Sequence, residues 1–291
     1  MSESPPRVTA CIPSYNSEKF IERTLKSIND QAYENLRVLI SDDCSTDKTV
    51  TLIRSFIKND NRFTLFEQKK NLGWINNVNF LLEKAASQGK YLFILPHDDC
   101  IDFDYIQKLT RALEENPSAV LSFSDMEVIH AGGKKIMTCP GLHGIENKID
   151  RIGKLLHREK WWWSAYRGIA RSEVVNTIIP IKKNLFGHKE FSMDWIWLIK
   201  LSLHGNFIRV PEILYSKYFG ENNLSYQLKH TTWNYLGNVV TGSKVLWRSS
   251  LPIYEQLTFQ RMIFVLILKR LVIASGLYSA GKWLKAKILT L

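Results

Sequence analysis

The sequence has few cysteines, and they are not placed as a metal or disulfide framework would require. Its four cysteines, in 291 residues, are widely spaced and include no CxxC pair. Structural zinc sites and small disulfide-bonded domains both need closely spaced cysteines. We therefore expect free thiols and a reducing compartment.

Long apolar runs are also missing. No stretch reaches the ~18 apolar residues that a membrane-spanning helix needs, and the run from Met262 to Leu268 ends at Lys269 and Arg270. The N-terminus, MSESPPRV, has no basic segment followed by an apolar core, as a secretion signal would have. These absences favour a cytoplasmic protein.

Acidic residues become scarce in the second half of the chain. Up to Pro140 there are 17 Lys and Arg against 19 Asp and Glu, whereas from Gly141 onward there are 22 against 9. Such asymmetry favours an anionic partner for the C-terminal part, which could be a membrane surface, a phosphorylated substrate or nucleic acid. The alternative is a basic face that only water covers.

Short apolar strands alternate with helical segments through the first half. The expected strands are 8–12, 36–41, 63–66, 91–95 and 119–123. Apolar residues recur at helical spacing between them, in 18–28, 46–57, 78–86 and 105–113. Further on, we expect a helix over 194–203, a short strand over 207–210, and two or three helices from Trp233 onward, broken near Pro252 and Gly276. This order predicts an α/β fold with a mostly parallel sheet flanked by helices.

Polar clusters follow three of the expected strands. They are Pro13-Ser-Tyr-Asn16, Asp42-Asp43 and His97-Asp98-Asp99. Because ligands of such sheets bind beyond the carboxyl ends of the strands, we expect these clusters to meet at one site.

The two adjacent carboxylates Asp98 and Asp99 would repel each other if left unpaired. A Mg²⁺ or Mn²⁺ ion, bound by one or two carboxylates and by substrate phosphate oxygens, would relieve this repulsion. The alternative is that they cap the helical segment that begins near Asp102.

Other residues near the strand ends could contact a nucleotide. Asp42 could accept the imide N–H of a pyrimidine base, while Asp43 or Asp47 could cap the next helix. The loop Asn71-Leu-Gly73 allows close approach of backbone to a ligand, although it could also be an ordinary turn.

Two features of the second half suit an acceptor site. Three consecutive indoles, Trp161 to Trp163, cannot all face one core, so at least one should be exposed or line a cleft, where its face would suit a sugar ring. Core packing or membrane contact is the alternative for each. Asp194 heads a helix, which suits either a general base or an N-cap.

In order and spacing, the segments PSYN (13–16), SDDCSTD (41–47), NLG (71–73) and HDD (97–99) resemble family-2 inverting glycosyltransferases of the GT-A fold. The resemblance covers roughly residues 8–226. It implies a GT-A domain over 1–225, with a nucleotide-binding half about 1–125 and an acceptor half about 126–225. A basic, helical C-terminal extension would occupy 226–291.

The resemblance also implies roles for individual residues. Pro13, Tyr15 and Asn16 would shape the nucleotide pocket together with Asn71 and Gly73, and Asp42 would contact the base. Asp98 and Asp99 would form the metal and ribose-diphosphate pair, and Asp194 would be the catalytic base. The residues expected beside the acceptor are Trp162, Trp163, Arg171 and Trp195.

The chain departs from the family pattern at two positions. His97 replaces the usual first Asp of the metal motif, and no His follows the late strand in Tyr218–Ser225. Both departures predict either weaker metal binding or a metal shell that water completes. The QxxRW motif of processive enzymes is absent, which favours transfer of a single sugar.

Taken together, the residues and the resemblance predict an enzyme that uses a UDP- or dTDP-sugar and a saccharide or lipid-linked acceptor in cell-surface polysaccharide or glycolipid assembly. We do not expect nucleic acid as a partner, and an oligomer is possible. The alternatives are a nucleotidyltransferase on a similar sheet, a non-enzymatic nucleic-acid-binding protein, and an inactive membrane-docked homologue. For the basic C-terminal helices, peripheral docking on the inner face of a membrane competes with plain helix packing or dimerisation.

Overall fold

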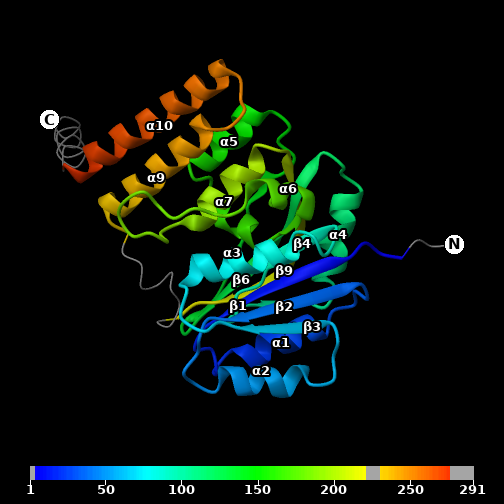
Figure 1. Cartoon of the computed structure of the whole chain (residues 1–291). Helices are drawn as coiled ribbons and strands as arrows, with labels where there is room; N and C mark the ends of the chain where they lie inside the picture. Colours follow the sequence, from blue (N-terminus) through cyan, green and yellow to red (C-terminus); the bar gives the residue numbers. More distant parts are fainter. Residues whose placement is uncertain (1–3, 221–229, 276–291) are drawn as a thin grey trace.

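The computed structural model describes residues 4–220 and 230–275, and its central feature is one mixed sheet with helices on both faces (Figure 1). The strands run in the order β3-β2-β1-β4-β8-β6-β9-β5, with β7 paired to the outer part of β6. Their bounds are β1 Val8–Ser14, β2 Leu36–Asp42, β3 Phe63–Glu67, β4 Tyr91–Ile94, β5 Cys100–Ile101, β6 Ala119–His130, β7 Gly133–Met137, β8 Ile169–Arg171 and β9 Asn206–Tyr218.

The first four strands of that order are parallel, as the sequence predicts. The crossover helices are α1 (Ile21–Asn29), α2 (Thr49–Ile57) and α3 (Trp74–Ala85), and α4 (Tyr105–Glu114) follows β5. Side chains of β1 alternate between two cores, since Ala10 and Ile12 join the core beneath α1 and α4, whereas Cys11 joins the core beneath α3.

The second half of the sheet is mixed rather than parallel. Strand β8 pairs antiparallel with both β4 and β6, while β6 pairs parallel with β9. The helical segments of this half are η1 (Pro140–Leu142), α5 (Lys148–Leu156), η2 (Trp162–Arg167), α6 (Ser172–Ile178) and α7 (Met193–Ser202). Of these, only α7 corresponds to a helix expected from the sequence.

Two helices follow the sheet, α9 (Thr232–Trp247) and α10 (Ile253–Ala274), and the break between them falls at Pro252 as expected. The expected break near Gly276 lies outside the described residues. The inner residues of α10, Phe259, Ile263 and Leu266, belong to the same core as α5 and α7. The C-terminal helices therefore complete this core.

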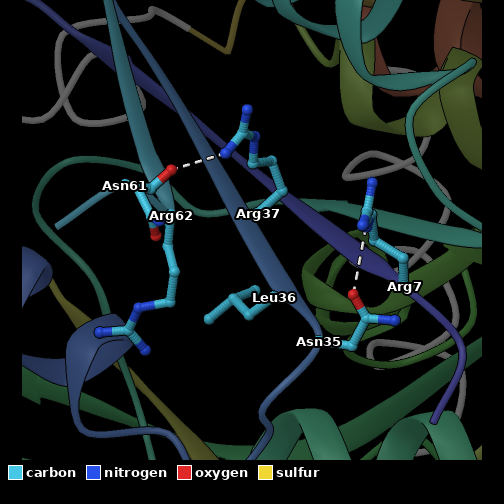
Figure 2. A pocket seen from close by; sticks show the side chains of 6 residues that line it. All are labelled: Arg7, Asn35, Leu36, Arg37, Asn61 and Arg62. Atoms are coloured by element: carbon cyan, nitrogen blue, oxygen red, sulfur yellow. Dashed lines mark hydrogen bonds between the residues drawn. The ribbon is translucent and has the colours of Figure 1, made fainter. Parts of the chain in front are cut away.

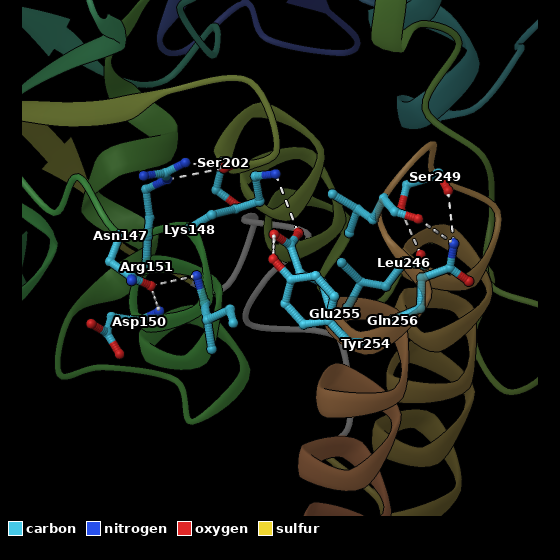
Figure 3. A network of polar contacts seen from close by, with 12 residues as sticks. Asn147, Lys148, Asp150, Arg151, Ser202, Leu246, Ser249, Tyr254, Glu255 and Gln256 are labelled. Atoms are coloured by element: carbon cyan, nitrogen blue, oxygen red, sulfur yellow. Dashed lines mark hydrogen bonds and ion pairs between the residues drawn. The ribbon is translucent and has the colours of Figure 1, made fainter.

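Polar contacts hold α10 against α5 (Figure 3). At the start of α10, Gln256 Nε2 donates to the carbonyl of Leu251, just before the helix, at 2.9 Å. Between α10 and α5, the Lys148 ammonium lies 3.2 Å from the carboxylate of Glu255. Beside this pair, Arg151 donates to the Ser202 carbonyl through Nε and Nη2, which ties α5 to α7. The four cysteines are free, as expected. Within the described parts of the chain, every helix is too short or too polar to cross a bilayer.

Candidate functional site

The three polar clusters lie at one edge of the sheet because β2, β1 and β4 are adjacent and parallel. Ser14 at the end of β1 pairs in register with Asp42 at the end of β2. On the other side, His97 Nδ1 lies 3.1 Å from the Pro13 carbonyl oxygen. The expected convergence of strand ends is therefore present.

Mutual hydrogen bonds join the loops after β1 and β2. Asn16, in the left-handed region with φ 44°, accepts from the Thr46 amide at 2.9 Å and donates its own amide to Ser45 Oγ at 2.9 Å. Asp42 is 1% exposed and accepts from both the amide and the hydroxyl of Ser45. Tyr15 is 44% exposed at the rim, and Pro13 is buried in β1. The base contact expected of Asp42 stays a prediction, and it would have to form beside Ser45.

Asp43 anchors the loop that contains Gly73. Its carboxylate accepts from the amides of Leu72 at 2.7 Å and Gly73 at 3.0 Å. Burial, the largest cause, raises the pKa of Asp43 in spite of these bonds. Asp47 instead makes the helix-start contact, accepting from the Thr49 amide at 2.9 Å.

The same loop is held from the other half of the chain by Glu190, a residue that sequence reasoning missed. Glu190 Oε1 accepts from the Ile75 amide at 3.1 Å, in the first turn of α3. Gly73 has φ +81°, and a Cβ there would lie 3.2 Å from the same oxygen. Asn71 Oδ1 accepts from the Gly73 amide at 2.9 Å, so the loop is a built turn at the edge of the site.

Helix α1 fixes the backbone that carries the two adjacent carboxylates. The Thr24 hydroxyl lies 2.8 Å from the carbonyl oxygens of both His97 and Asp99. Arg23 Nη2 donates to the Asp98 carbonyl at 3.0 Å. Helix α4 begins after Asp104, so neither Asp98 nor Asp99 is its N-cap.

Asp99 lies in an internal ion pair. It has no exposed surface, accepts from the Tyr215 hydroxyl at 2.8 Å, and lies 3.2 Å from Arg167 Nε and 3.9 Å from Lys217 Nζ. Its Oδ1 accepts no hydrogen bond from the described residues. The ligand role expected of Asp99 stays a prediction, and a metal ion there would compete with Arg167 and Lys217 for the carboxylate.

Asp98 is the more accessible carboxylate of the pair and remains partly exposed. Burial and the adjacent Asp99 raise its pKa, while His97, Lys217 and Arg167 act in the opposite direction. Among the described residues no three His, Cys, Asp or Glu side chains are grouped as a metal site. Asp98 offers one carboxylate, and an ion bound there would need its other oxygen ligands from outside that side chain.

Asp194 lies in the first turn of α7, where Ser192 rather than Asp194 is the N-cap. Its Oδ1 accepts from the Trp195 amide at 3.0 Å. Burial raises the pKa of Asp194, opposed by the charges of Arg167 and Arg158. Arg167 therefore pairs with Asp99, and its charge also acts on Asp194 in α7.

Arg158, whose charge also acts on Asp194, is surrounded by a wall of three aromatic rings. Its guanidinium carbon lies within 5.5 Å of the ring centres of Trp162, Trp195 and Tyr235. Its Nη2 donates to Asn238 Oδ1 at 2.9 Å. Because Tyr235 and Asn238 belong to α9, the C-terminal helices contribute to this wall.

Two of the expected acceptor residues are misplaced for that role. Trp195 has no exposed surface, and its Nε1 donates to the Leu155 carbonyl at 2.6 Å inside the core. Arg171 pairs with Tyr91, at the opposite end of β4 from Asp98, and donates to the carbonyls of Ala119 and Leu113. Both expectations were wrong, since these side chains support the fold.

The three consecutive indoles differ in exposure, as expected from the sequence. Trp162 is buried under Arg158, whereas Trp161 and Trp163 remain partly exposed and pack against both cores. Trp163 stays a candidate for acceptor contact.

A shallow hollow of about 390 Å³ lies at the amino end of the strands, away from this site (Figure 2). Its lining includes Arg7, Arg37 and Arg62, of which Arg62 is paired with Asp60. Arg7 donates to Asn35 and Arg37 to the Asn61 carbonyl, as the dashed lines in Figure 2 show. None of the sequence-predicted site residues lines it.

Several related proteins are named as glycosyltransferases. An uncharacterized glycosyltransferase of Haemophilus influenzae is 34% identical over 231 residues, which are 75% of this chain and 90% of that protein. A second one from the same organism is 34% identical over 44% of this chain, which spans only 39% of that longer protein. The GalNAc(5)-diNAcBac-PP-undecaprenol beta-1,3-glucosyltransferase of Campylobacter jejuni is 30% identical over 32% of this chain and 30% of its own length.

Solved structures confirm the expected fold. TarS of S. aureus, in complex with UDP-GlcNAc, superposes with a TM-score of 0.69 at 16% identity, over 91% of this chain and 72% of that one. A mannosyltransferase of Pyrobaculum calidifontis, in complex with GDP-Man and Mn²⁺, gives 0.58 at 15% identity, over 97% and 81%. At these identities the likeness shows the GT-A fold alone.

A family model described as glycosyl transferase family 2 matches residues 9–161, more than half of the 291-residue chain. This match and the Haemophilus relative that the chain spans almost completely confirm the family predicted from the motifs. The protein belongs to glycosyl transferase family 2.

Proposed function

We propose that this protein is an inverting glycosyltransferase that moves one sugar from a nucleoside diphosphate sugar to a hydroxyl group of an acceptor. One observation carries the proposal. Arg167 forms an ion pair with Asp99 at the strand-end edge, and its charge lowers the pKa of Asp194 at the start of α7, so the residues expected at the donor and those expected at the acceptor share one electrostatic environment.

Asp194 is the proposed base. A carboxylate whose pKa is raised by burial is a stronger base than an exposed one once it is ionised. It takes the proton of the acceptor hydroxyl while the hydroxyl oxygen attacks the anomeric carbon. The bond from that carbon to the diphosphate oxygen breaks, the nucleoside diphosphate leaves, and the configuration at the carbon inverts.

Asp98 is the proposed ligand of a Mg²⁺ or Mn²⁺ ion, which when bound would offset the charge of the leaving diphosphate. The cations around Asp98, namely Arg167 and Lys217, act in the same electrostatic sense. Because a single carboxylate supplies the protein's share, we expect the metal to bind weakly without nucleotide.

The donor nucleotide is proposed to lie on the rim made by Tyr15 and Asn16, against the Asn71–Gly73 turn and next to Asp42. An acidic side chain beside a base favours UDP or dTDP over GDP, because uracil and thymine carry an imide N–H. The names of the Campylobacter relative and of the UDP-GlcNAc complex support a role in cell-surface polysaccharide or glycolipid assembly, with a saccharide or lipid-linked acceptor. The same considerations favour an enzyme over the nucleotidyltransferase and non-enzymatic alternatives.

A thermal-shift panel of UDP, dTDP and GDP, each with and without Mn²⁺, tests the donor assignment. At a ligand concentration about 100-fold above Kd we expect UDP or dTDP with Mn²⁺ to raise Tm by about 5–10 °C. The Asp98→Asn variant should lose the Mn²⁺-dependent part of the shift, whereas Asp102→Asn, an exposed carboxylate four positions on, should keep it. Absence of any nucleotide-dependent shift in the parent protein would remove the donor site.

A further inference from the structure

Helix α10 has an apolar face that the described chain leaves uncovered. Leu257 is 55% exposed, Phe264 60% and Leu268 44%, at positions that fall on the same side of successive turns. The same side carries further exposed apolar residues: Ile253, Tyr254, Val265, Leu271 and Val272. We call these eight residues the outer stripe of α10.

The opposite side of α10 is apolar as well, because Phe259, Ile263 and Leu266 pack into the core. A helix that is apolar on both sides is normally covered on both sides. Figure 1 shows α10 at the outer boundary of the molecule, beyond α9 and α5 and away from the sheet. Within residues 4–220 and 230–275 nothing covers the outer stripe, which faces outward and is available to an external surface.

The charges near the outer stripe indicate which kind of external surface it would contact. Arg261 lies within the outer stripe and Lys269 beside it, both are exposed, and neither forms an ion pair with any described residue. The one acidic residue between 230 and 275, Glu255, is buried and paired with Lys148. An apolar stripe with one uncompensated cation within it and another beside it matches a surface that is apolar inside and anionic at its boundary.

We propose that the outer stripe of α10 docks on a bilayer of anionic phospholipids. The Leu, Ile, Val and Phe side chains would enter the acyl boundary, and Arg261 and Lys269 would reach the lipid phosphates along their flexible stems. Tyr254, 60% exposed near the start of the helix, has the amphipathic ring that suits the headgroup level.

A second copy of the chain fits the stripe less well. In a two-fold dimer the same patch meets itself. Arg261 lies near the middle of α10, so the two Arg261 side chains would approach each other with no acidic partner on either stripe. The charge of Arg261 therefore disfavours contact between the outer stripes of two copies, whereas the same charge favours contact with anionic phospholipid.

Vesicle sedimentation of the full-length protein tests the proposal, and it reads lipid binding rather than activity. We expect binding to vesicles of phosphatidylglycerol and phosphatidylcholine, weak binding to pure phosphatidylcholine, and weakening by salt. The Phe264→Glu/Leu268→Glu variant should lose binding by tenfold or more. The matched control Phe103→Glu/Ile136→Glu, which changes two equally exposed apolar residues elsewhere, should bind like the parent.

A second variant separates the charge from the apolar contribution. Arg261→Gln/Lys269→Gln should weaken binding to phosphatidylglycerol vesicles about fivefold for each charge removed. Equal binding of the parent and of both α10 variants would overturn the proposal. So would a lipid-free dimer, seen by analytical ultracentrifugation, that Phe264→Glu dissociates, and so would failure of the parent protein to bind anionic vesicles.

Discussion

Asp98 and Asp99 are adjacent in the sequence, but the fold places their carboxylates in different environments, which the sequence alone does not distinguish. Asp99 is fully buried against Arg167, Lys217 and Tyr215. Asp98 is partly exposed, and burial and the adjacent Asp99 raise its pKa. Their neutral variants should therefore change stability in opposite directions.

Asp98→Asn should raise Tm at pH 7. A carboxyl group whose pKa in the folded state lies above the ordinary 3.8 favours folding while it is protonated, and this contribution is lost as pH rises through the raised pKa. Removal of the ionised group at pH 7 thus stabilises the protein, and the gain should shrink toward zero below pH ~4. Scanning calorimetry across pH measures both effects, and a lower Tm at pH 7 would contradict the assignment.

Asp99→Asn should lower the free energy of unfolding by on the order of 3 kcal/mol, because it leaves the charges of Arg167 and Lys217 buried without their counter-ion. Urea unfolding of the two variants side by side gives the comparison. Similar stability of Asp98→Asn and Asp99→Asn would mean that the two carboxylates are not distinguished as described.

The charge of Arg158 should be visible in the pH profile of the reaction. Arg158 lowers the pKa of Asp194, against the larger effect of burial, which raises it. A base must be ionised to act, so kcat/KM should fall on the acid side as Asp194 is protonated. In Arg158→Gln the acid limb should move to higher pH, while Lys154→Gln, an exposed cation on α5, should leave it in place. An unmoved limb would separate Arg158 from the base.

At the scale of single elements, the start of α3 depends on both halves of the chain. Asp43 and Glu190 hold its backbone amides, and Gly73 adopts a φ of +81° that only glycine adopts without strain. Gly73→Ala should destabilise the fold by about 1–3 kcal/mol and weaken nucleotide binding. Gly132→Ala, at an exposed position with open space around it, should change stability by less than about 0.5 kcal/mol. Equal effects of the two changes would show that the turn is not constrained.

Helices and strands with regularly spaced apolar residues were predictable from the sequence, whereas short or interrupted ones were not. The parallel strands and α4 match the expected segments closely, because the spacing of their apolar residues reflects which faces are buried. Strand β9 was expected to cover only residues 207–210, and the next residue, Pro211, cannot donate to a ladder. It continues because the pairing with β6 shifts between Ser124 and Asp125, which leaves Pro211 and Glu212 in a bulge. The three-residue strand β8 has too few residues for any period.

At the scale of the whole molecule, the acidic part of the site was predictable and its basic part was not. Carboxylates after parallel strands meet because the topology requires it, so Asp42 and Asp98 could be placed from the sequence. The basic side chains come from the second half of the chain, Arg167 from η2 and Lys217 from β9, and Glu190 comes from a loop before α7. Their positions depend on the antiparallel insertion of β8, which no local sequence pattern predicts. Arg171, which lies in β8 itself, was misjudged for the same reason.

The most direct test of the proposed function is Asp194→Asn, measured as kcat and as Kd for the donor nucleotide. We expect kcat to fall by about 10²–10⁴-fold, as loss of a general base does, with donor affinity unchanged because we propose that Asp194 acts on the acceptor. Glu173→Gln is the matched control, since Glu173 is also an acidic residue in the first turn of its helix but is exposed away from the site. A kcat in Asp194→Asn equal to that of Glu173→Gln would contradict the assignment of the base.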